Sequence, residues 1–131
     1  MTVSKILEKK GAQVHTTHMD VSLRQIIHKL NEANVGILVC VDAFDSIVGI
    51  ISERDVVRSI ARHGDEALSM PVSTFMTRDV VACNPADEVA HLLIVMTETR
   101  CRHLPVVSEG QLIGLVSIGD LVKVHLHSRS E

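Results

Sequence analysis

The chain has 131 residues, of which 46% are hydrophobic and 2% aromatic, and its formal net charge is −3. This length suits one compact domain or two small halves around a shared core, while the negative charge and the absence of Trp and Tyr argue against a general nucleic-acid-binding role. No apolar run approaches the roughly 18 residues of a membrane span, and the N-terminus lacks a signal-peptide core, so we expect a cytoplasmic protein.

The first half of the chain is expected to form an N-terminal helix followed by alternating strands and helices. Apolar residues at helical spacing (Val3, Ile6 and Leu7) before Gly11 predict the N-terminal helix. The elements expected next are a strand at 13–17, a helix at 21–33 with Asp20 as its N-cap, strands at 37–41 and 47–51, and a helix from Ser52 to about residue 63.

The second half is expected to repeat this order after a linker. Pro71 precedes one short predicted helix within 72–76. The elements expected next are a strand at 80–83, a helix to about residue 99 with Asn84 as its N-cap and Pro85 at its first position, strands at 103–107 and 112–116, and a helix that Ser117 caps and that ends near residue 126. The remaining tail is expected to fray.

The motif Gly-x-x-Ser-x-x-Asp occurs twice, at residues 49–55 and 114–120, and a matching apolar helix pattern precedes each copy. A repeat of this kind indicates two copies of one supersecondary unit. A small sheet with helices on one face cannot bury itself alone. We therefore expect an α/β (α+β) fold of two β-α-β-β-α repeats packed sheet to sheet around a pseudo-two-fold axis. Residues 1–66 would form repeat 1 with the N-terminal helix, and residues 67–131 would form repeat 2 with the linker helix.

With this motif at both expected places, the chain resembles a tandem CBS-domain pair (Bateman module) over nearly its whole length. The resemblance implies binding of an adenine nucleotide (AMP, ADP, ATP, NAD or S-adenosylmethionine) in clefts between the repeats. It implies that the motif Asp bonds the ribose hydroxyls, that the motif Ser and nearby basic residues meet phosphate, and that adenine lies against the first two strands of a repeat.

The resemblance assigns nucleotide-binding residues to both copies. In the second copy these are Val80, Val81, Ala82, Arg102, His103, Leu104, Pro105, Ser117 and Asp120. In the first copy they are Thr16, Ile37, Ser52, Arg54 and Asp55. The second copy is expected to bind better, because the first copy lacks counterparts of Arg102, His103 and Pro105.

The motif also has a physical rationale of its own. A Ser that ends a strand and opens a helix places its hydroxyl and several backbone N–H groups at one point, which suits an anion. The Asp in the first turn can accept two hydrogen bonds from a ribose diol. The alternative interpretation is a capping box, in which Ser and Asp satisfy the helix end without any ligand.

Other polar patterns carry weaker predictions. The pairs His15/His18 and His125/His127 lack further metal ligands in sequence, so we expect surface histidines and no metal. Arg58 and Arg62 lie on one helix face and are interpreted as solvated. No catalytic fingerprint is present, so we expect no enzyme activity and no covalent cofactor. The cysteines at 40 and 83 are expected to be buried as small hydrophobic residues.

The leading interpretation is a stand-alone, non-enzymatic regulatory module that signals energy or redox state to an unknown protein partner. The alternatives are a ligand-free interaction scaffold and a regulatory subunit of a nucleotide-metabolising enzyme. The predicted helix before residue 99 is apolar nearly all round, with Ile94 and Val95 outside its core stripe. Such a helix should be covered, so we expect a homodimer packed through it.

Overall fold

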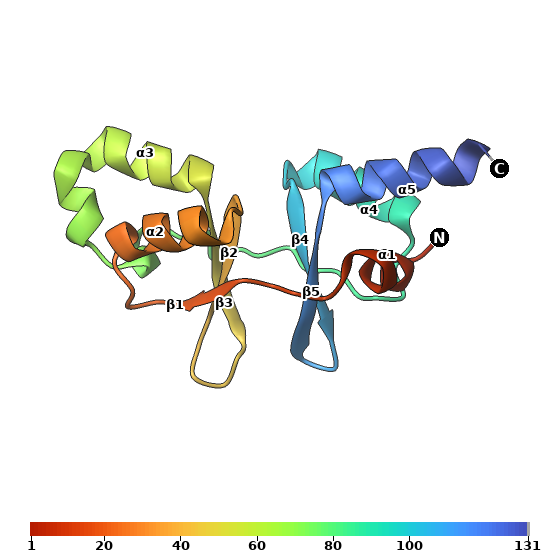
Figure 1. The fold of residues 1–131 in the computed structure, drawn as a ribbon, viewed down its shortest axis with the longest axis horizontal. Helices are drawn as coiled ribbons and strands as arrows, with labels where there is room; N and C mark the ends of the chain where they lie inside the picture. The colour runs from red at the N-terminus through yellow and green to blue at the C-terminus, as the bar shows by residue number, and fades with distance from the viewer. Residues whose placement is uncertain (131) are drawn as a thin grey trace. The chain divides into compact units, whose positions relative to one another are not determined.

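The computed structural model describes the backbone of residues 1–130 and the side chains of residues 1–127, and it divides into two compact units (Figure 1). One comprises residues 15–80 and contains the first motif; we call it the first-copy unit. The other, the second-copy unit, comprises residues 1–14 and the chain from residue 81 onward. The expected mixed α+β architecture is confirmed, and the arrangement of the copies relative to each other stays a prediction.

The first-copy unit is a three-stranded sheet with helices on one face (Figure 1). Its elements are β1 (Thr16–His18), α2 (Leu23–Ala33), β2 (Ile37–Val41), β3 (Ile47–Ser52), α3 (Glu53–His63) and the 3₁₀ helices η1 (Gly64–Ser69) and η2 (Val72–Thr74). The central strand β2 pairs parallel with β1 and antiparallel with β3. The core consists of Leu23, Ile26, Leu30, Leu38, Cys40, Ile51, Val56, Ala67, Val72 and Met76.

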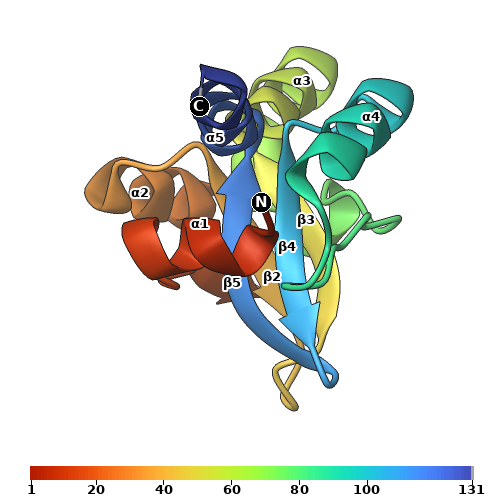
Figure 2. The same ribbon diagram turned by 90° about the vertical axis from the view of Figure 1, so that its right-hand side faces the viewer.

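The second-copy unit is built around the antiparallel hairpin of β4 and β5 (Figure 2). Its elements are α1 (Val3–Lys10), α4 (Val89–Thr99), β4 (His103–Ser108), β5 (Gln111–Ser117) and α5 (Ile118–Ser130). The last helix extends beyond its predicted end near residue 126, and of the predicted frayed tail Glu131 lies outside the described residues. The core consists of Val3, Ile6, Cys83, Val89, Leu92, Met96, Leu104, Val106, Val116 and Leu121.

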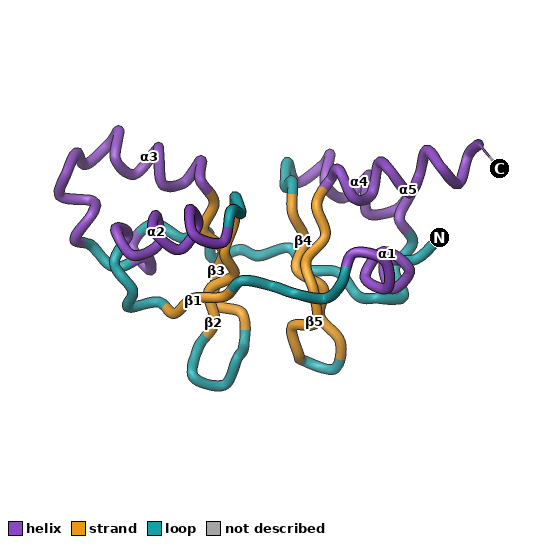
Figure 3. Tube along the Cα trace, viewed as in Figure 1, coloured by secondary structure: helices purple, strands orange, loops and turns teal. Residues whose placement is uncertain are grey.

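The strand predicted at residues 80–83 is wrong, because this segment is a loop with one isolated parallel bridge between Cys83 and Val106 (Figure 3). The corresponding strand in the first copy gains a bond from the Val39 N–H to the His15 carbonyl at 3.1 Å. Pro105 stands at the position of Val39 and has no N–H to donate. Only two backbone hydrogen bonds therefore remain, one made by the N–H of Cys83 and one by its carbonyl.

Two predicted N-caps are also wrong. The first is Asp20: α2 starts after Ser22, whose hydroxyl accepts from Gln25 N while the Gln25 side chain accepts from Ser22 N. The second is Asn84, whose side-chain oxygen instead accepts from Ala86 N in a turn that precedes α4. A reciprocal capping box satisfies two helix donors at once, which explains why Ser22 displaces the nearby Asp.

The segment that precedes each copy packs on the other copy. Val3 and Ile6 of α1 are buried in the core of the second-copy unit, where α1 crosses β5 (Figure 2), although the sequence prediction grouped this helix with residues 1–66. Val72, which precedes the second copy in sequence, is buried in the core of the first-copy unit. These exchanged segments explain why the compact units differ from a division at residue 66.

The motif glycines leave room for the exchanged segments to pack closely against the strands. A Cβ atom at Gly49 would lie 2.7 Å from Met76 Sδ and 2.9 Å from the Thr77 carbonyl oxygen. A Cβ atom at Gly114 would lie 2.7 Å from Leu7 Cδ2. Both glycines lie within strands, where glycine marks the close approach of another segment. The glycine of the motif therefore serves packing.

Candidate functional site

The first motif forms a capping box at the junction of β3 and α3. Ser52 Oγ accepts from Asp55 N at 3.2 Å, and Asp55 Oδ2 accepts from Ser52 N at 2.9 Å and from the Ser52 hydroxyl at 3.0 Å. The Gly36 carbonyl accepts from Glu53 N at 3.0 Å, which ties the start of β2 to the start of α3. Ile37 pairs with Ser52 across the sheet, so these predicted site residues do come together.

The second motif repeats this geometry at the junction of β5 and α5. Ser117 Oγ accepts from Asp120 N at 3.1 Å, and Asp120 Oδ2 accepts from Ser117 N at 2.9 Å. The Arg102 carbonyl accepts from Ile118 N at 2.8 Å, and His103 pairs with Ser117 across the sheet. The structure therefore brings together four predicted site residues: Arg102, His103, Ser117 and Asp120.

The capping boxes change what the motif can offer a ligand. In the first copy the N–H groups of Glu53 and Asp55 are already bonded within the protein, as are those of Ile118 and Asp120 in the second. An anion at either helix start therefore meets fewer free donors than the sequence suggested. The capping bonds use only Oδ2 of each Asp, so they do not themselves engage the second carboxylate oxygen.

Lys10 distinguishes the second motif from the first. Its ammonium donates to Asp120 Oδ2 at 2.8 Å and to the Leu115 carbonyl at 3.0 Å. Burial alone would raise the pKa of Asp120, but the bond and charge of Lys10 and the bonds from Ser117 outweigh it, so the pKa lies below its usual range. Sequence reasoning missed Lys10, because only the packing of α1 on the second copy brings it to the motif.

His103 lies close enough to the second motif to share its charges. Burial lowers the pKa of His103; Lys10 and Arg102 lower it further, while Asp120 opposes them. The folded state therefore favours the neutral imidazole, which can either donate or accept a hydrogen bond. This property suits a ligand hydroxyl better than the phosphate that the resemblance implies for basic residues near the motif.

The lowered pKa of His103 predicts a loss of stability in mild acid. Since the folded pKa lies below the unfolded one, stability is complete above the unfolded pKa of about 6.5 and declines as the pH falls toward the folded pKa. After solvent screening of a half-buried group, the loss should stay below about 1 kcal/mol. Urea denaturation across this range should show a flatter pH dependence for His103→Gln. His91→Gln, at an exposed position on α4, is the control, and equal slopes for His103→Gln and wild type would contradict the prediction.

Two groups of the residues predicted to contact adenine lie in unexpected places. Leu104 is fully buried in the core of the second-copy unit, so its side chain does not line a slot and only its backbone could. Pro105 is buried as well. In the loop that replaces the predicted strand at 80–83, Val80 belongs to the first-copy unit, whereas Val81 and Ala82 belong to the second.

The remaining predicted site residues lie at or near the surface. Arg54 and Arg102 have exposed side chains, and no hydrogen bond or ion pair engages either guanidinium within the described part of the chain. Thr16 is half-buried in β1, and its carbonyl accepts a bond from Lys29 Nζ. Both arginines are therefore available to a ligand.

The cysteines at 40 and 83 and the potential metal ligands among the described residues do not form a site. Cys40 and Cys83 are buried as predicted, and burial raises their pKa to about 11 and about 12, with Asp87 contributing at Cys83. Thiols with such values are poor nucleophiles. Within the described residues, no three His, Cys, Asp or Glu side chains gather where they could hold a metal ion. The described helices include none that is long and apolar enough to span a membrane.

Comparisons with known proteins agree with this architecture. The CBS domain family matches the chain twice, at residues 3–62 and 72–127, and each match begins with an exchanged segment. The chain is 31% identical to the CBS domain-containing protein CBSX3, mitochondrial, of Arabidopsis thaliana, over 99% of this chain and 67% of that protein.

Solved structures have the same fold. The CBS-domain protein ATU1752 from Agrobacterium tumefaciens superposes with a TM-score of 0.91 at 38% identity, covering 95% of this chain and 99% of that one. The CBS domain pair of protein MJ0100, in complex with 5-methylthioadenosine and S-adenosyl-L-methionine, gives a TM-score of 0.84 at 25% identity, covering 95% and 99%. This chain belongs to the CBS-domain family, as a pair of CBS domains.

Proposed function

We propose that this chain is a non-catalytic regulatory module that binds an adenosine-containing ligand at its Ser-x-x-Asp motifs. The observation that carries the proposal is that both copies build the strand–helix junction with the same backbone bond, from Glu53 N to the Gly36 carbonyl and from Ile118 N to the Arg102 carbonyl. Each junction presents an Asp whose capping bonds use one carboxylate oxygen. A carboxylate so placed can accept hydrogen bonds from a ribose diol, and the ligands named for the MJ0100 pair both contain adenosine.

Among adenosine-containing ligands, we propose AMP, ADP, ATP and NAD as the specific candidates. The second copy is the better proposed site, because His103 and Arg102 join Ser117 and Asp120 there. The expectation that the ligand lies between the copies stays a prediction. Binding would signal to a protein partner only if the ligand favours one of two arrangements of the protein over the other.

Titration calorimetry with adenosine, AMP, ATP, NAD and S-adenosylmethionine tests the proposal. Heat of binding is expected for at least one of them and not for guanosine, which shares the ribose but not the base. No heat with any adenosine compound would favour the ligand-free scaffold over the sensor. Turnover of a bound nucleotide would instead revive a role as part of a nucleotide-metabolising enzyme. Mass spectrometry of small molecules that copurify with the chain would name the ligand directly.

We also propose a homodimer packed through α4. Ile94 leaves 57% of its surface exposed on a helix that is otherwise rich in apolar residues. Val95, which the sequence analysis placed on the same outer surface, instead packs against the core of its unit. Ile94 is therefore the apolar residue of α4 whose exposure most needs a partner.

Replacing Ile94 by glutamate is expected to shift the dimer to a monomer, because a carboxylate at the interface would be buried without a partner. Sedimentation velocity at micromolar concentration measures the shift. Phe44→Glu is the matched control, since Phe44 is 85% exposed in the turn between β2 and β3 and not on α4. A wild-type chain that sediments as a monomer would contradict the proposal.

A further inference from the structure

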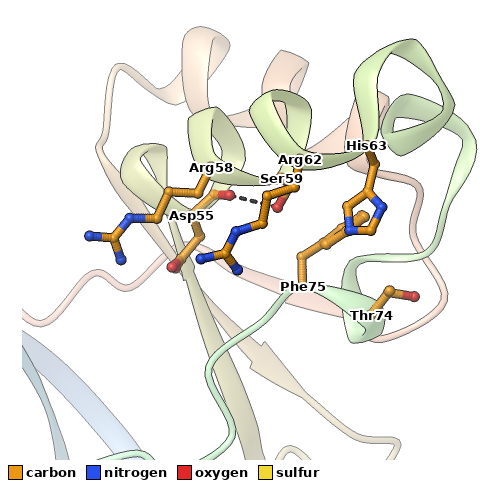
Figure 4. Close-up of a pocket in the computed structure, with 7 residues that line it drawn as sticks. All are labelled: Asp55, Arg58, Ser59, Arg62, His63, Thr74 and Phe75. Atoms are coloured by element: carbon orange, nitrogen blue, oxygen red, sulfur yellow. Dashed lines mark hydrogen bonds between the residues drawn. The ribbon is translucent and has the colours of Figure 1, made fainter.

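A cavity of about 240 Å³ lies on the flank of α3, within the first-copy unit (Figure 4). It is lined by Asp55, Arg58, Ser59, Arg62, His63, Thr74 and Phe75. Figure 4 shows the side chains of Arg58 and Arg62 extending from the helix on the same side as Asp55. The ring centroids of His63 and Phe75 lie 5.4 Å apart at the far end of the cavity, with the rings tilted by 50°.

The charges of this cavity are not balanced from within the protein. Arg58 and Arg62 lie one turn apart, where like charges disfavour a helix. Neither has a hydrogen bond or ion pair among the described residues. Asp55 is the one acid in the lining, and its Oδ2 already accepts from the Ser52 N–H and hydroxyl. The helix dipole accounts for cations in the last turn, which includes Arg62 and His63 but not Arg58.

The size and donors of the cavity indicate the class of ligand. Its volume is below the roughly 300–1,000 Å³ of pockets for drug-sized molecules, so it suits a small anion or one group of a larger ligand. Two guanidinium forks match the oxygens of a phosphoryl group.

The second copy has an equivalent cavity, of about 340 Å³, along α5. Lys123 and His127 line it and follow Asp120 by the same number of residues as Arg58 and Arg62 follow Asp55. Lys9 and Lys10 of α1 add two cations to this lining. Both linings therefore place basic side chains three and seven residues after the motif Asp: arginines in the first copy, and a lysine and a histidine in the second.

We propose that the flank of α3 is a phosphoryl-binding site. Arg58 and Arg62 donate hydrogen bonds to the phosphoryl oxygens there, beside the motif Asp55. The proposal differs from the sequence interpretation of these exposed arginines as solvated, and it does not depend on adenosine binding at the motif. The phosphoryl group can come from free phosphate or from a nucleotide.

Calorimetric titration with inorganic phosphate at low ionic strength tests the site. The double variant Arg58→Gln, Arg62→Gln is expected to bind phosphate at least about tenfold more weakly than wild type. Arg24→Gln, at an exposed position on α2 outside the cavity, should bind as wild type does. Amide NMR shifts on adding phosphate should concentrate at residues 58–63 and 74–75. Equal affinity of the double variant and wild type, no binding to wild type, or shifts confined to α5 would overturn the proposal.

Asp55→Asn separates this site from the proposed adenosine site. The change removes a negative charge from the cavity lining, so phosphate should bind more tightly, whereas adenosine should bind more weakly at the motif. Weaker phosphate binding to Asp55→Asn would contradict the proposed phosphoryl site and would leave the proposed adenosine site unaffected. The source of the phosphoryl group follows from AMP. If AMP binds wild type more tightly than adenosine does, and the double variant loses this advantage, the nucleotide supplies the group; if the advantage persists, free phosphate does.

Discussion

Replacing Gly49 by alanine should lower the free energy of unfolding by about 1–3 kcal/mol, the usual cost of overpacking a filled interior. The added Cβ would meet Met76 Sδ at 2.7 Å and the Thr77 carbonyl oxygen at 2.9 Å. Thr77 is held by two backbone bonds to Ile50, at 2.8 and 2.9 Å, so this carbonyl cannot move away without breaking the pairing. Strain should therefore spread into the exchanged segment that completes the first-copy unit.

The same substitution at Gly114 is the matched comparison. There the Cβ would meet only the end of the Leu7 side chain, at 2.7 and 3.0 Å, and a leucine can change its side-chain conformation. The expected cost is less than about 1 kcal/mol. Urea denaturation followed by circular dichroism measures both changes. Equal losses at the two glycines would show that backbone contact at Gly49 is not the deciding factor.

Replacing Asp120 by asparagine should weaken adenosine binding by about 1–3 kcal/mol, because the ribose would lose hydrogen bonds to a charged acceptor. Asparagine keeps an oxygen that can accept from Ser117 N, so the helix cap should survive. Asp55→Asn should cost less, since the first copy lacks counterparts of Arg102 and His103. Calorimetry of the two variants measures the difference, and equal losses would reverse the ranking of the copies.

Lys10→Met provides the internal check on that ranking. Lys10 bonds to the oxygen of Asp120 that also serves the cap, so a ligand at this carboxylate competes with it. Without the ammonium, adenosine should bind the second copy several-fold more tightly. Weaker binding of adenosine to Lys10→Met would show that Lys10 is a ligand contact and not a competitor.

The order of most helices and strands could be predicted, because each has a strong local pattern. Ser52 and Gly64 bound α3 as predicted, and the five buried positions of β2 follow from an uninterrupted apolar run. The failures came from interactions between segments. Pro105 weakens a strand more than twenty positions away in sequence, and no local feature of residues 80–83 reveals it.

The candidate site divides in the same way. Ser52, Asp55, Ser117 and Asp120 could be found because the repeat marks them, and the capping alternative was visible in the same residues. Lys10 could not be found, since its link to Asp120 depends on which copy α1 covers. The burial of the Leu104 side chain in the core was not foreseen either, and a contact of its backbone with a ligand stays a prediction.

Because the covering segments are exchanged, the N-terminal helix contributes to the core of the second copy and not to that of the first. A chain cut between residues 66 and 67 would leave each half without the segment that covers it, so neither half should fold as its intact unit does. A partner protein that binds the first ten residues would therefore perturb the core that contains Val116 and Leu121. Through Lys10 it would also perturb Asp120. The first ten residues are thus coupled to the second motif, although the two are far apart in sequence.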